Sequence, residues 1–454
     1  MTAGRPRGLP VRLAWTACLA VRGRGQSRFP FLDPDEIRGA RDRAVRRIVT
    51  HAWRSVPAYK EAMRDRALRP EDFRTAEDLA RLPLLESHDL QVRPDELLPV
   101  DYPPDRGLTL RSGGSTGTPH GVRHDPGALI ANVAHGERDR ALVAEHVGRW
   151  SGYRQLSFMP PFASGPEIQA FVAERTIRPA GLRIERQTAS VFEDFERAAA
   201  RIDRERPDVV QGYGSYIGSL FRHIAMSGGG RHRPRMVTYS SDALSEANRA
   251  LIEEELGIPV LGRYQAIEAL KIAFQCGAGP WMHVNEDLYP VRIVDGEGNT
   301  VADGDPGQVV ISNLVNRATV LLNYRLEDRA RRLPGACPCG RTLPRMSLPE
   351  GRSDDWIALP SGEILHPLAV RTLFVDESAV WEYQVIQEAA NRFRVNLVVD
   401  PGADREDLER RVETKFTARL GPGTTVAIAF VDALTRTPGG KVRGFMRHPG
   451  PAEA

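Results

Sequence analysis

Residues 112–121 combine the backbone and side chains that an anion-binding loop needs. They read SGGSTGTPHG, with four glycines, two serines and two threonines in ten residues. Glycine lets the backbone turn tightly and approach a ligand, because it has no Cβ. Consecutive N–H groups and hydroxyls would then face a phosphate. The composition predicts a phosphate-binding loop, although no Gly-Lys-Ser/Thr follows as in a Walker loop. A Gly/Ser/Thr-rich surface turn is the alternative.

A second set of residues has the chemistry of a metal site. The side chains are three thiols and one imidazole, from Cys276, His283, Cys337 and Cys339. This donor set suits tetrahedral Zn²⁺, and four protein ligands would leave no open position, so the predicted zinc is structural. Unliganded thiols are the alternative, and Cys18 lies outside the set.

Lys441 is the best candidate for a catalytic cation. It lies in RTPGGKVRG, a glycine-rich turn near the C-terminus, in a chain that has only four lysines and otherwise uses arginine. An ammonium on such a turn could swing into a site and stabilise developing negative charge. A plain surface lysine is the alternative.

Five segments, in this order, resemble the motifs of the phenylacetate–CoA ligase family of adenylate-forming enzymes, and the resemblance covers about residues 31–441. They are the phosphate-binding loop, Tyr264-x-x-x-Glu268, Tyr324-Arg-x-x-Asp328, Gly351-Arg352-x-Asp354 and Gly440-Lys441. The resemblance implies that ATP activates a small-molecule carboxylic acid to an acyl-adenylate, with release of pyrophosphate, and that CoA then accepts the acyl group. Members of the family also show the Cys…His…Cys-x-Cys pattern.

The resemblance also implies roles for individual residues. The triphosphate would lie on Ser112, Gly113, Gly114, Ser115, Thr116, Gly117 and Thr118. Glu268 would bind Mg²⁺, which prefers carboxylate oxygen, and Tyr264 would stack on adenine near Ser241 and Asp242. Asp328 would accept the ribose hydroxyls, with Arg325 orienting it. A solvated glutamate and a structural Arg–Asp pair are the alternatives.

Other assignments concern the hinge and the acid. Arg352 is assigned to the nucleotide site, and Asp354 to a hinge that absorbs a domain rotation. The acid pocket is assigned to Tyr213, Gly214 and Tyr239, with Tyr216 and Phe162 as further candidates. Aromatic walls suit an aryl or arylacetic acid, because offset stacking favours flat rings. For each aromatic residue, a place in the core is the alternative.

The chain departs from the family pattern in two places. Thr118 stands where the family has lysine, so that its hydroxyl, His120 or Arg123 would have to compensate. Residues 356–365 predict a β-hairpin instead of the family's glycine-containing loop. The acceptor therefore stays open between CoA and an amine, a hydroxyl or a carrier-protein thiol. A nucleotide-binding pseudoenzyme is a third reading.

The surrounding pattern predicts an α/β fold with layered, mostly parallel sheets. Expected strands at 156–159, 208–214, 236–240 and 259–264 alternate with expected helices at 125–147, 192–204 and 245–256, as in α/β proteins. A helical stretch at 34–66 precedes them. Strands at 289–294, 307–311 and 319–324 predict a β-rich subdomain, and residues 379–431 predict a small strand–strand–helix–strand unit. The expected division is an extension at 1–28, mobile or loosely docked, an adenylation domain at 29–352 and a C-terminal α+β lid at 353–454.

Composition limits the class of protein. The chain has 454 residues, 41% hydrophobic and 27% charged, with a net charge of +3. These values predict a multi-domain soluble protein. We expect a cytoplasmic enzyme without a nucleic-acid or membrane partner, because there is no basic patch with interleaved aromatics and the apolar stretch at 13–21 is too short for a span. A homodimer is left open.

Overall fold

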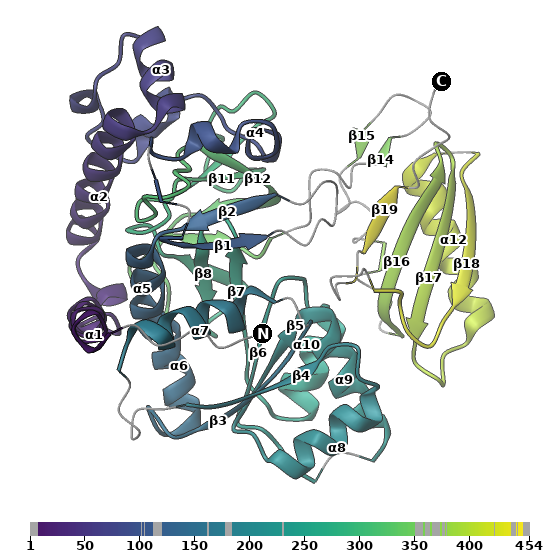
Figure 1. Ribbon diagram of the computed structural model, residues 1–454. Coiled ribbons are helices and arrows are strands. Elements are labelled where there is room, and N and C mark those ends of the chain that lie inside the picture. The colour runs from purple at the N-terminus through teal and green to yellow at the C-terminus, as the bar shows by residue number, and fades with distance from the viewer. Residues whose placement is uncertain are drawn as a thin grey trace.

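The computed structural model describes residues 8–100, 102–103, 105–111, 120–160, 163–177, 184–228, 231–349, 357–358, 364–365, 373–374, 377, 379–421, 423–436, 442 and 444–447. Within these residues an 11-stranded mixed sheet forms the centre of the larger domain, in the order β10-β11-β12-β13-β9-β8-β7-β6-β5-β3-β4 (Figure 1). Its strands are β3 (Arg154–Met159), β4 (Glu185–Ser190), β5 (Val209–Tyr213), β6 (Met236–Ser240), β7 (Val260–Ala266), β8 (Leu270–Gln275), β9 (Trp281–Val284), β10 (Val291–Val294), β11 (Pro306–Ile311), β12 (Tyr324–Leu333) and β13 (Arg345–Ser347).

The sheet has a parallel half and an antiparallel half. The pairs β4-β3, β3-β5, β5-β6 and β6-β7 are parallel, whereas β7-β8, β8-β9 and the pairs from β13 to β10 are antiparallel. The prediction of an α/β fold with a β-rich part is confirmed. The two parts share one continuous sheet, because β8 pairs directly with the last parallel strand.

Helices cover both faces of the parallel half. Side chains alternate between the two faces of a strand, so Val210 packs with α8 (Phe195–Glu205) and α9 (Gly214–Met226). Val209 packs on the other side with Leu142 and Val143 of α6 (Glu137–Val147). The other helices in this region are α5 (Pro126–His135), α7 (Ser164–Arg175), α10 (Glu246–Ala250) and a π-helical turn, η6 (Leu251–Glu255).

The N-terminal helices cover the antiparallel half. The predicted helix at 34–66 is two helices, α2 (Pro34–Ser55) and α3 (Pro57–Asp65), because the residue before proline is pushed out of helical geometry. Their apolar faces share one core with the antiparallel strands. Shorter turns follow at η1 (Phe29–Phe31), η2 (Pro70–Asp72), η3 (Glu77–Arg81), α4 (Ser87–Val92) and η4 (Pro94–Leu97).

Residues 9–23 of the expected N-terminal extension form a helix, α1 (Leu9–Gly23), which docks on α5 and α7. Trp15, Cys18 and Leu19 recur at helical spacing and pack against the core between those helices. The segment is therefore docked rather than mobile, although none of its residues is fully buried. In the described part of the chain, every helix is too short or too polar to cross a bilayer.

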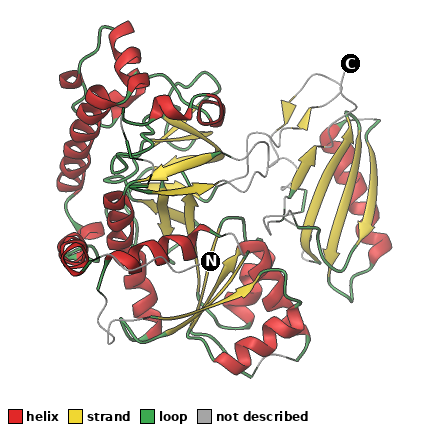
Figure 2. Ribbon diagram, viewed as in Figure 1, coloured by secondary structure: helices red, strands yellow, loops and turns green. Residues whose placement is uncertain are grey.

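A second unit lies at the C-terminal end of the chain. Its four-stranded sheet has the order β18-β17-β16-β19 and is backed by α12 (Arg405–Leu420) (Figure 2). The strands are β16 (Val380–Ala389), β17 (Arg392–Val399), β18 (Thr425–Phe430) and β19 (Phe445–Arg447). This matches the predicted strand–strand–helix–strand pattern, with β19 added. A small antiparallel pair, β14 (Ile357–Ala358) and β15 (Ile364–Leu365), lies where the hairpin was expected.

Candidate functional site

The two predicted nucleotide-binding elements around Tyr264 and Tyr324 contact each other. Tyr264 lies on β7 and is buried, and its Oη donates to Asp328 Oδ2 on β12 at 2.7 Å. Tyr324, at the start of β12, donates from Oη to Glu268 Oε1 at 3.4 Å. The tyrosine of each element therefore holds the carboxylate of the other. Burial and the Glu268 charge raise the pKa of Tyr324, which keeps its hydroxyl protonated as a donor.

Glu268 lies in the turn between β7 and β8 and is only 7% exposed. His120 Nε2 lies 2.9 Å from Glu268 Oε1, and Asn313 Nδ2 donates to the Glu268 carbonyl at 2.8 Å. The backbone and the side chain of Glu268 are thus both held by neighbouring side chains. His120, one of the residues expected to compensate for the missing lysine, faces this carboxylate.

The phosphate-binding loop joins two strands that lead to Glu268. β1 (Leu108–Arg111) and β2 (Gly121–His124) pair antiparallel, and the pair nearest to the loop is Arg111 with Gly121. Residues 112–118 of the predicted loop lie outside the described residues, as do Phe162, Arg352, Asp354 and Lys441. Their assignments stay predictions.

The predicted adenine turn packs on the start of α9. Ser241 has φ of +76°, which turns the chain sharply, and Asp242 accepts hydrogen bonds from Ser215 N at 3.1 Å and Ser215 Oγ at 2.6 Å. A Cβ on Gly214 would lie 2.6 Å from the Ala243 carbonyl carbon, so only glycine allows this approach.

Of the predicted acid-pocket tyrosines, one lies near this turn and the other in the core. Tyr213, at the end of β5, is half-buried. Burial and the nearby Asp242 charge raise its pKa to about 12. Tyr239 is a core residue whose hydroxyl accepts from Arg249 Nη2 at 3.1 Å. Its surroundings favour the core alternative over a place in the acid pocket.

The segment that carries Lys441 reaches the adenine turn. Val442 N, the chain neighbour of Lys441, donates to Asp242 Oδ2 at 3.4 Å. Arg436, at the start of the same segment, donates to Ser215 Oγ at 2.8 Å, and its guanidinium lies 5.4 Å from the centre of the Tyr216 ring. The structure thus brings the C-terminal segment against the larger domain.

A buried polar contact joins the two domains. Glu382 on β16 is 7% exposed and accepts from Ser219 Oγ at 2.6 Å and Asn248 Nδ2 at 3.3 Å. Arg222 Nη1, also buried, lies 3.5 Å from the same carboxylate. Ser245 Oγ donates to the Trp381 carbonyl at 3.1 Å. These contacts hold the C-terminal sheet on α9 and α10.

Several of these residues were not predicted. Ser215 directly follows the predicted Tyr213-Gly214, and Arg436 begins the Lys441 motif, so proximity in sequence could have found both. Nothing marks Glu382 among 59 acidic residues, or Arg222 among the arginines.

One predicted role is wrong. Arg325 does not orient Asp328: it donates to Glu86 Oε1 at 3.0 Å and to the Gly296 carbonyl at 3.2 Å. Residues three apart on a strand point to opposite faces, and both lie on β12. Tyr264 takes the expected place beside Asp328.

The predicted metal ligands form one cluster. The ligand atoms of Cys276, His283, Cys337 and Cys339 all lie within 4.8 Å of one another. Cys339 Sγ is 3.4 Å from His283 Nε2, and His283 Nδ1 is 3.3 Å from the Leu343 carbonyl. A histidine whose Nδ1–H donates to a carbonyl presents Nε2 to a metal. Burial lowers the pKa of His283 to about 4, so its ring is neutral, as a ligand must be.

The chain is similar to several known proteins. The family described as the CapK C-terminal domain matches residues 357–448. The phenylacetate-coenzyme A ligase of Escherichia coli is 26% identical over 350 residues, or 72% of this chain and 73% of the relative. The enzyme of that name from Thermus thermophilus is 22% identical over 92% of this chain and 98% of its own length.

A solved structure shows the same fold. 2-Hydroxyisobutyryl-CoA ligase, in a postadenylation state with R3-HIB-AMP, aligns with a TM-score of 0.71 at 17% identity, covering 92% of this chain and 91% of that chain. The chain is therefore similar to phenylacetate-coenzyme A ligases over most of its length, and its residues 357–448 match the CapK C-terminal domain.

Proposed function

We propose that the chain uses ATP to convert a carboxylic acid to an acyl-adenylate and pyrophosphate, and then transfers the acyl group to CoA. The observation that carries the proposal is the reciprocal pairing of Tyr264 with Asp328 and of Tyr324 with Glu268. It brings the two carboxylates assigned to ribose and Mg²⁺ to one place, at the ends of the strands that carry the phosphate-binding loop. The relatives, named as CoA ligases, support the same chemistry.

Each group has one task in this reaction. Asp328 accepts the ribose hydroxyls while Tyr264 fixes its second oxygen. Glu268 would hold Mg²⁺, which would supply charge stabilisation for the phosphates. The phosphate-binding loop holds the triphosphate. Lys441 stabilises the charge that develops as the carboxylate attacks the α-phosphorus. Most of the rate enhancement in such a transfer comes from positioning and electrostatics.

The arrangement of the two domains supports the role of Lys441. Asp242 binds the backbone of Val442, and Arg436 binds Ser215. These contacts hold Arg436 and Val442, which flank Lys441 in the sequence, at the adenine turn and the start of α9. In this proposal Lys441 reaches the adenylate only while the C-terminal domain is docked on the larger domain. The adenylation step then depends on the contacts that Glu382 makes between the two domains.

We propose an aryl or arylacetic acid as the substrate. The relatives named for phenylacetate support this class, and half-buried Tyr213 offers a flat apolar wall beside the adenine turn. A panel of acids, read by acid-dependent exchange of labelled pyrophosphate into ATP, tests both the reaction and the acid. If none of the acids supports exchange while nucleotide binding is measurable, the result would favour a pseudoenzyme.

A second acceptor is favoured by the C-terminal unit. Residues 357–448 match the CapK C-terminal domain, and the β14–β15 pair lies where the sequence departs from the loop that the family resemblance implies. An amine, a hydroxyl or a carrier-protein thiol is therefore the alternative acceptor. Offering CoA, hydroxylamine and carrier proteins in turn to the formed adenylate separates these cases.

We also propose that the four-residue cluster binds one structural Zn²⁺. Cys276, His283, Cys337 and Cys339 would be the ligands, and the Leu343 carbonyl would fix the ring of His283. The cluster joins the end of β8, β9 and the loop before β13. A metal there would hold that loop on the antiparallel half of the sheet.

A further inference from the structure

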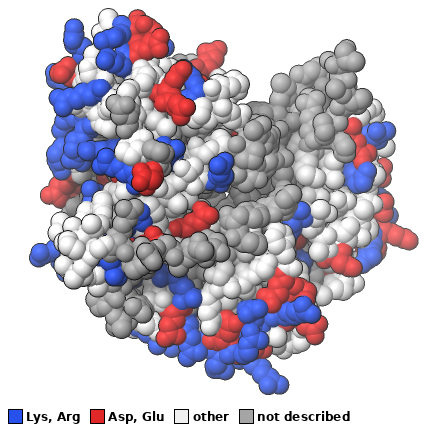
Figure 3. Space-filling model, in the orientation of Figure 1, with Lys and Arg blue, Asp and Glu red and all other residues white. Residues whose placement is uncertain are grey.

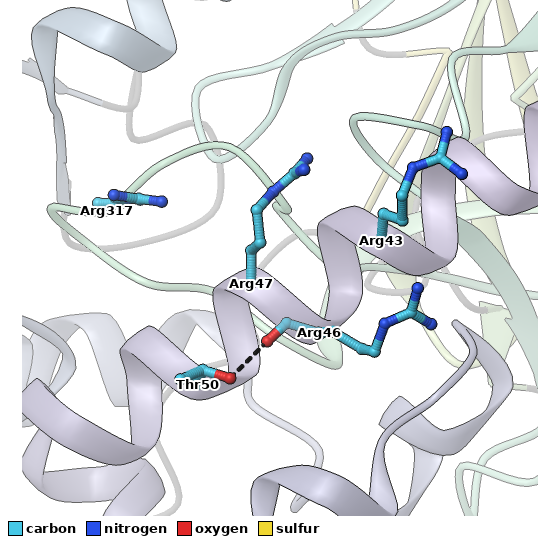
Figure 4. Close-up of a pocket in the computed structure, with 5 residues that line it drawn as sticks. All are labelled: Arg43, Arg46, Arg47, Thr50 and Arg317. Atoms are coloured by element: carbon cyan, nitrogen blue, oxygen red, sulfur yellow. Dashed lines mark hydrogen bonds between the residues drawn. The ribbon is translucent and has the colours of Figure 1, made fainter.

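A surface depression on α2 is lined almost wholly by arginine. It has a volume of about 450 Å³, and its lining residues are Arg43, Arg46, Arg47 and Thr50 of α2 and Arg317 of the loop between β11 and β12. Figure 4 shows the arginine side chains leaving α2, with Arg317 on the loop that faces the helix. Lys and Arg side chains gather along this edge of the molecule in Figure 3.

These arginines lack the acidic partners that the rest of the helix provides. Arg41 of the same helix pairs with Asp42 at 2.8 Å and with Glu286 at 3.0 Å. In the part of the chain that the structure describes, no carboxylate forms an ion pair with Arg43, Arg46, Arg47 or Arg317. Like charges three or four residues apart on a helix repel each other. An anion bound between them would remove that cost.

The depression is held open by contacts of its own backbone. His51 Nε2, one turn after Arg47, lies 3.1 Å from the Arg317 carbonyl, and Arg317 N donates to Asp125 Oδ2 at 2.7 Å. The same carboxylate caps α5 through Gly127 N at 2.7 Å. Arg46 Nη1 donates to the Arg74 carbonyl at 3.0 Å. The backbone of Arg317 is thus held opposite α2.

We propose that this depression binds an anion that carries two or more phosphate groups. A guanidinium presents a planar fork of donors that matches phosphate oxygens, and several forks at one site select several phosphates. One exposed ion pair contributes little, so affinity must come from multiple contacts.

The depression is separate from the proposed nucleotide site. β2 begins beside the phosphate-binding loop at Gly121 and ends at His124, next to the Asp125 that holds Arg317. The depression therefore lies at the far end of this strand. In Figure 1, α2 and the C-terminal sheet form opposite edges of the molecule.

The test compares three triple variants that keep the fold. Arg43→Ala/Arg47→Ala/Arg317→Ala removes the site, and the corresponding Lys variant keeps the charge but removes the forks. Arg197→Ala/Arg204→Ala/Arg392→Ala is the charge-matched control, because these arginines are 78%, 65% and 61% exposed in their side chains and lie elsewhere. The probe is tripolyphosphate, titrated calorimetrically in Mg²⁺-free buffer.

We expect the wild type and the control to bind tripolyphosphate with similar affinity, the Ala variant to bind at least tenfold more weakly and the Lys variant to fall between. Tripolyphosphate should raise the melting temperature of the wild type but not that of the Ala variant. Equal binding by wild type and Ala variant, or no binding by either, would overturn the proposal. Loss of binding in the control would show a general charge effect and also overturn it. Arginine-dependent binding to phosphatidylglycerol vesicles without binding of tripolyphosphate would also overturn the proposal, because the partner would then be a membrane surface.

Discussion

Tyr264 Oη donates to Asp328 Oδ2 at 2.7 Å, across 64 positions of sequence. The Tyr264 hydroxyl fixes one oxygen of the Asp328 carboxylate. The orientation of this carboxylate is therefore set by β7, which carries Tyr264, rather than by its own strand, β12. The corresponding hydrogen bond from Tyr324 to Glu268 makes the Tyr264–Glu268 and Tyr324–Asp328 elements depend on each other. The proposed ribose and metal carboxylates are therefore positioned as a pair.

Tyr264→Phe should weaken ATP binding while the fold remains intact. The ring stays in place, but Asp328 loses its donor, and a hydrogen bond to a charged group is typically worth about 1.5–3 kcal/mol. We expect KM for ATP to rise about tenfold or more in the pyrophosphate-exchange reaction. Tyr239→Phe is the matched control, because its hydroxyl binds Arg249 in the core. An unchanged KM in Tyr264→Phe would mean that the Asp328 orientation does not matter for the nucleotide.

Glu382→Ala should slow adenylation more than acyl transfer. The variant leaves buried Arg222 without its carboxylate and removes the acceptor of Ser219 and Asn248, which weakens the docked arrangement. We expect the adenylation rate to fall at least about tenfold, equivalent to about 1.4 kcal/mol. Transfer from a synthetic acyl-adenylate should change far less.

Glu388→Ala is the control for this variant, since Glu388 lies on the same strand and pairs with Arg392 within the C-terminal unit. Equal slowing of both half-reactions in Glu382→Ala would point to general destabilisation of the domain instead of loss of one docked state.

Protein purified without chelator should carry about one Zn²⁺ per chain, as one four-ligand site requires. Cys337→Ser should lower that content and reduce the melting temperature, because metal binding contributes to folding. Cys18→Ser, outside the cluster, should change neither quantity. Metal analysis that finds no zinc in the wild type would exclude the structural role.

Much of the fold could be predicted because its signals are local. The strand at 236–240 was predicted with the bounds that β6 shows, from a short apolar run between turn residues. The expected helix at 125–147 is instead two helices, α5 and α6, which meet at Gly136. Periodicity alone does not reveal this break.

Non-local partners explain the wrong strand at 319–324. Only Tyr324 belongs to a strand, β12. The backbone before it bonds to scattered backbone groups and to a side chain instead of forming a ladder. Leu322 N donates to Tyr59 Oη at 2.7 Å, and Tyr59 Oη donates to the Val320 carbonyl at 3.1 Å. The apolar, β-branched composition predicted a strand, but the partner on α3 could not be seen in the sequence.

The candidate site divides in the same way. Motif residues such as Glu268 and Asp328 have a recognisable spacing, so they could be named in advance. Their hydrogen-bond partners, His120 and the two tyrosine hydroxyls, depend on how β2, β7 and β12 lie together. The Glu382 contact depends on domain docking and carries no local signal.

The most direct test of adenylate formation is acid-dependent exchange of labelled pyrophosphate into ATP, with wild type and Lys441→Ala compared on the best acid of a panel. The wild type should exchange. Loss of a charge-assisted contact to the developing anion typically costs about 3 kcal/mol or more, so Lys441→Ala should exchange at least about 10²-fold more slowly. Nucleotide binding should be little changed, and Lys60→Ala, on exposed α3 surface, should match the wild type. Exchange at the wild-type rate in Lys441→Ala, or no exchange by the wild type with any acid, would contradict the account.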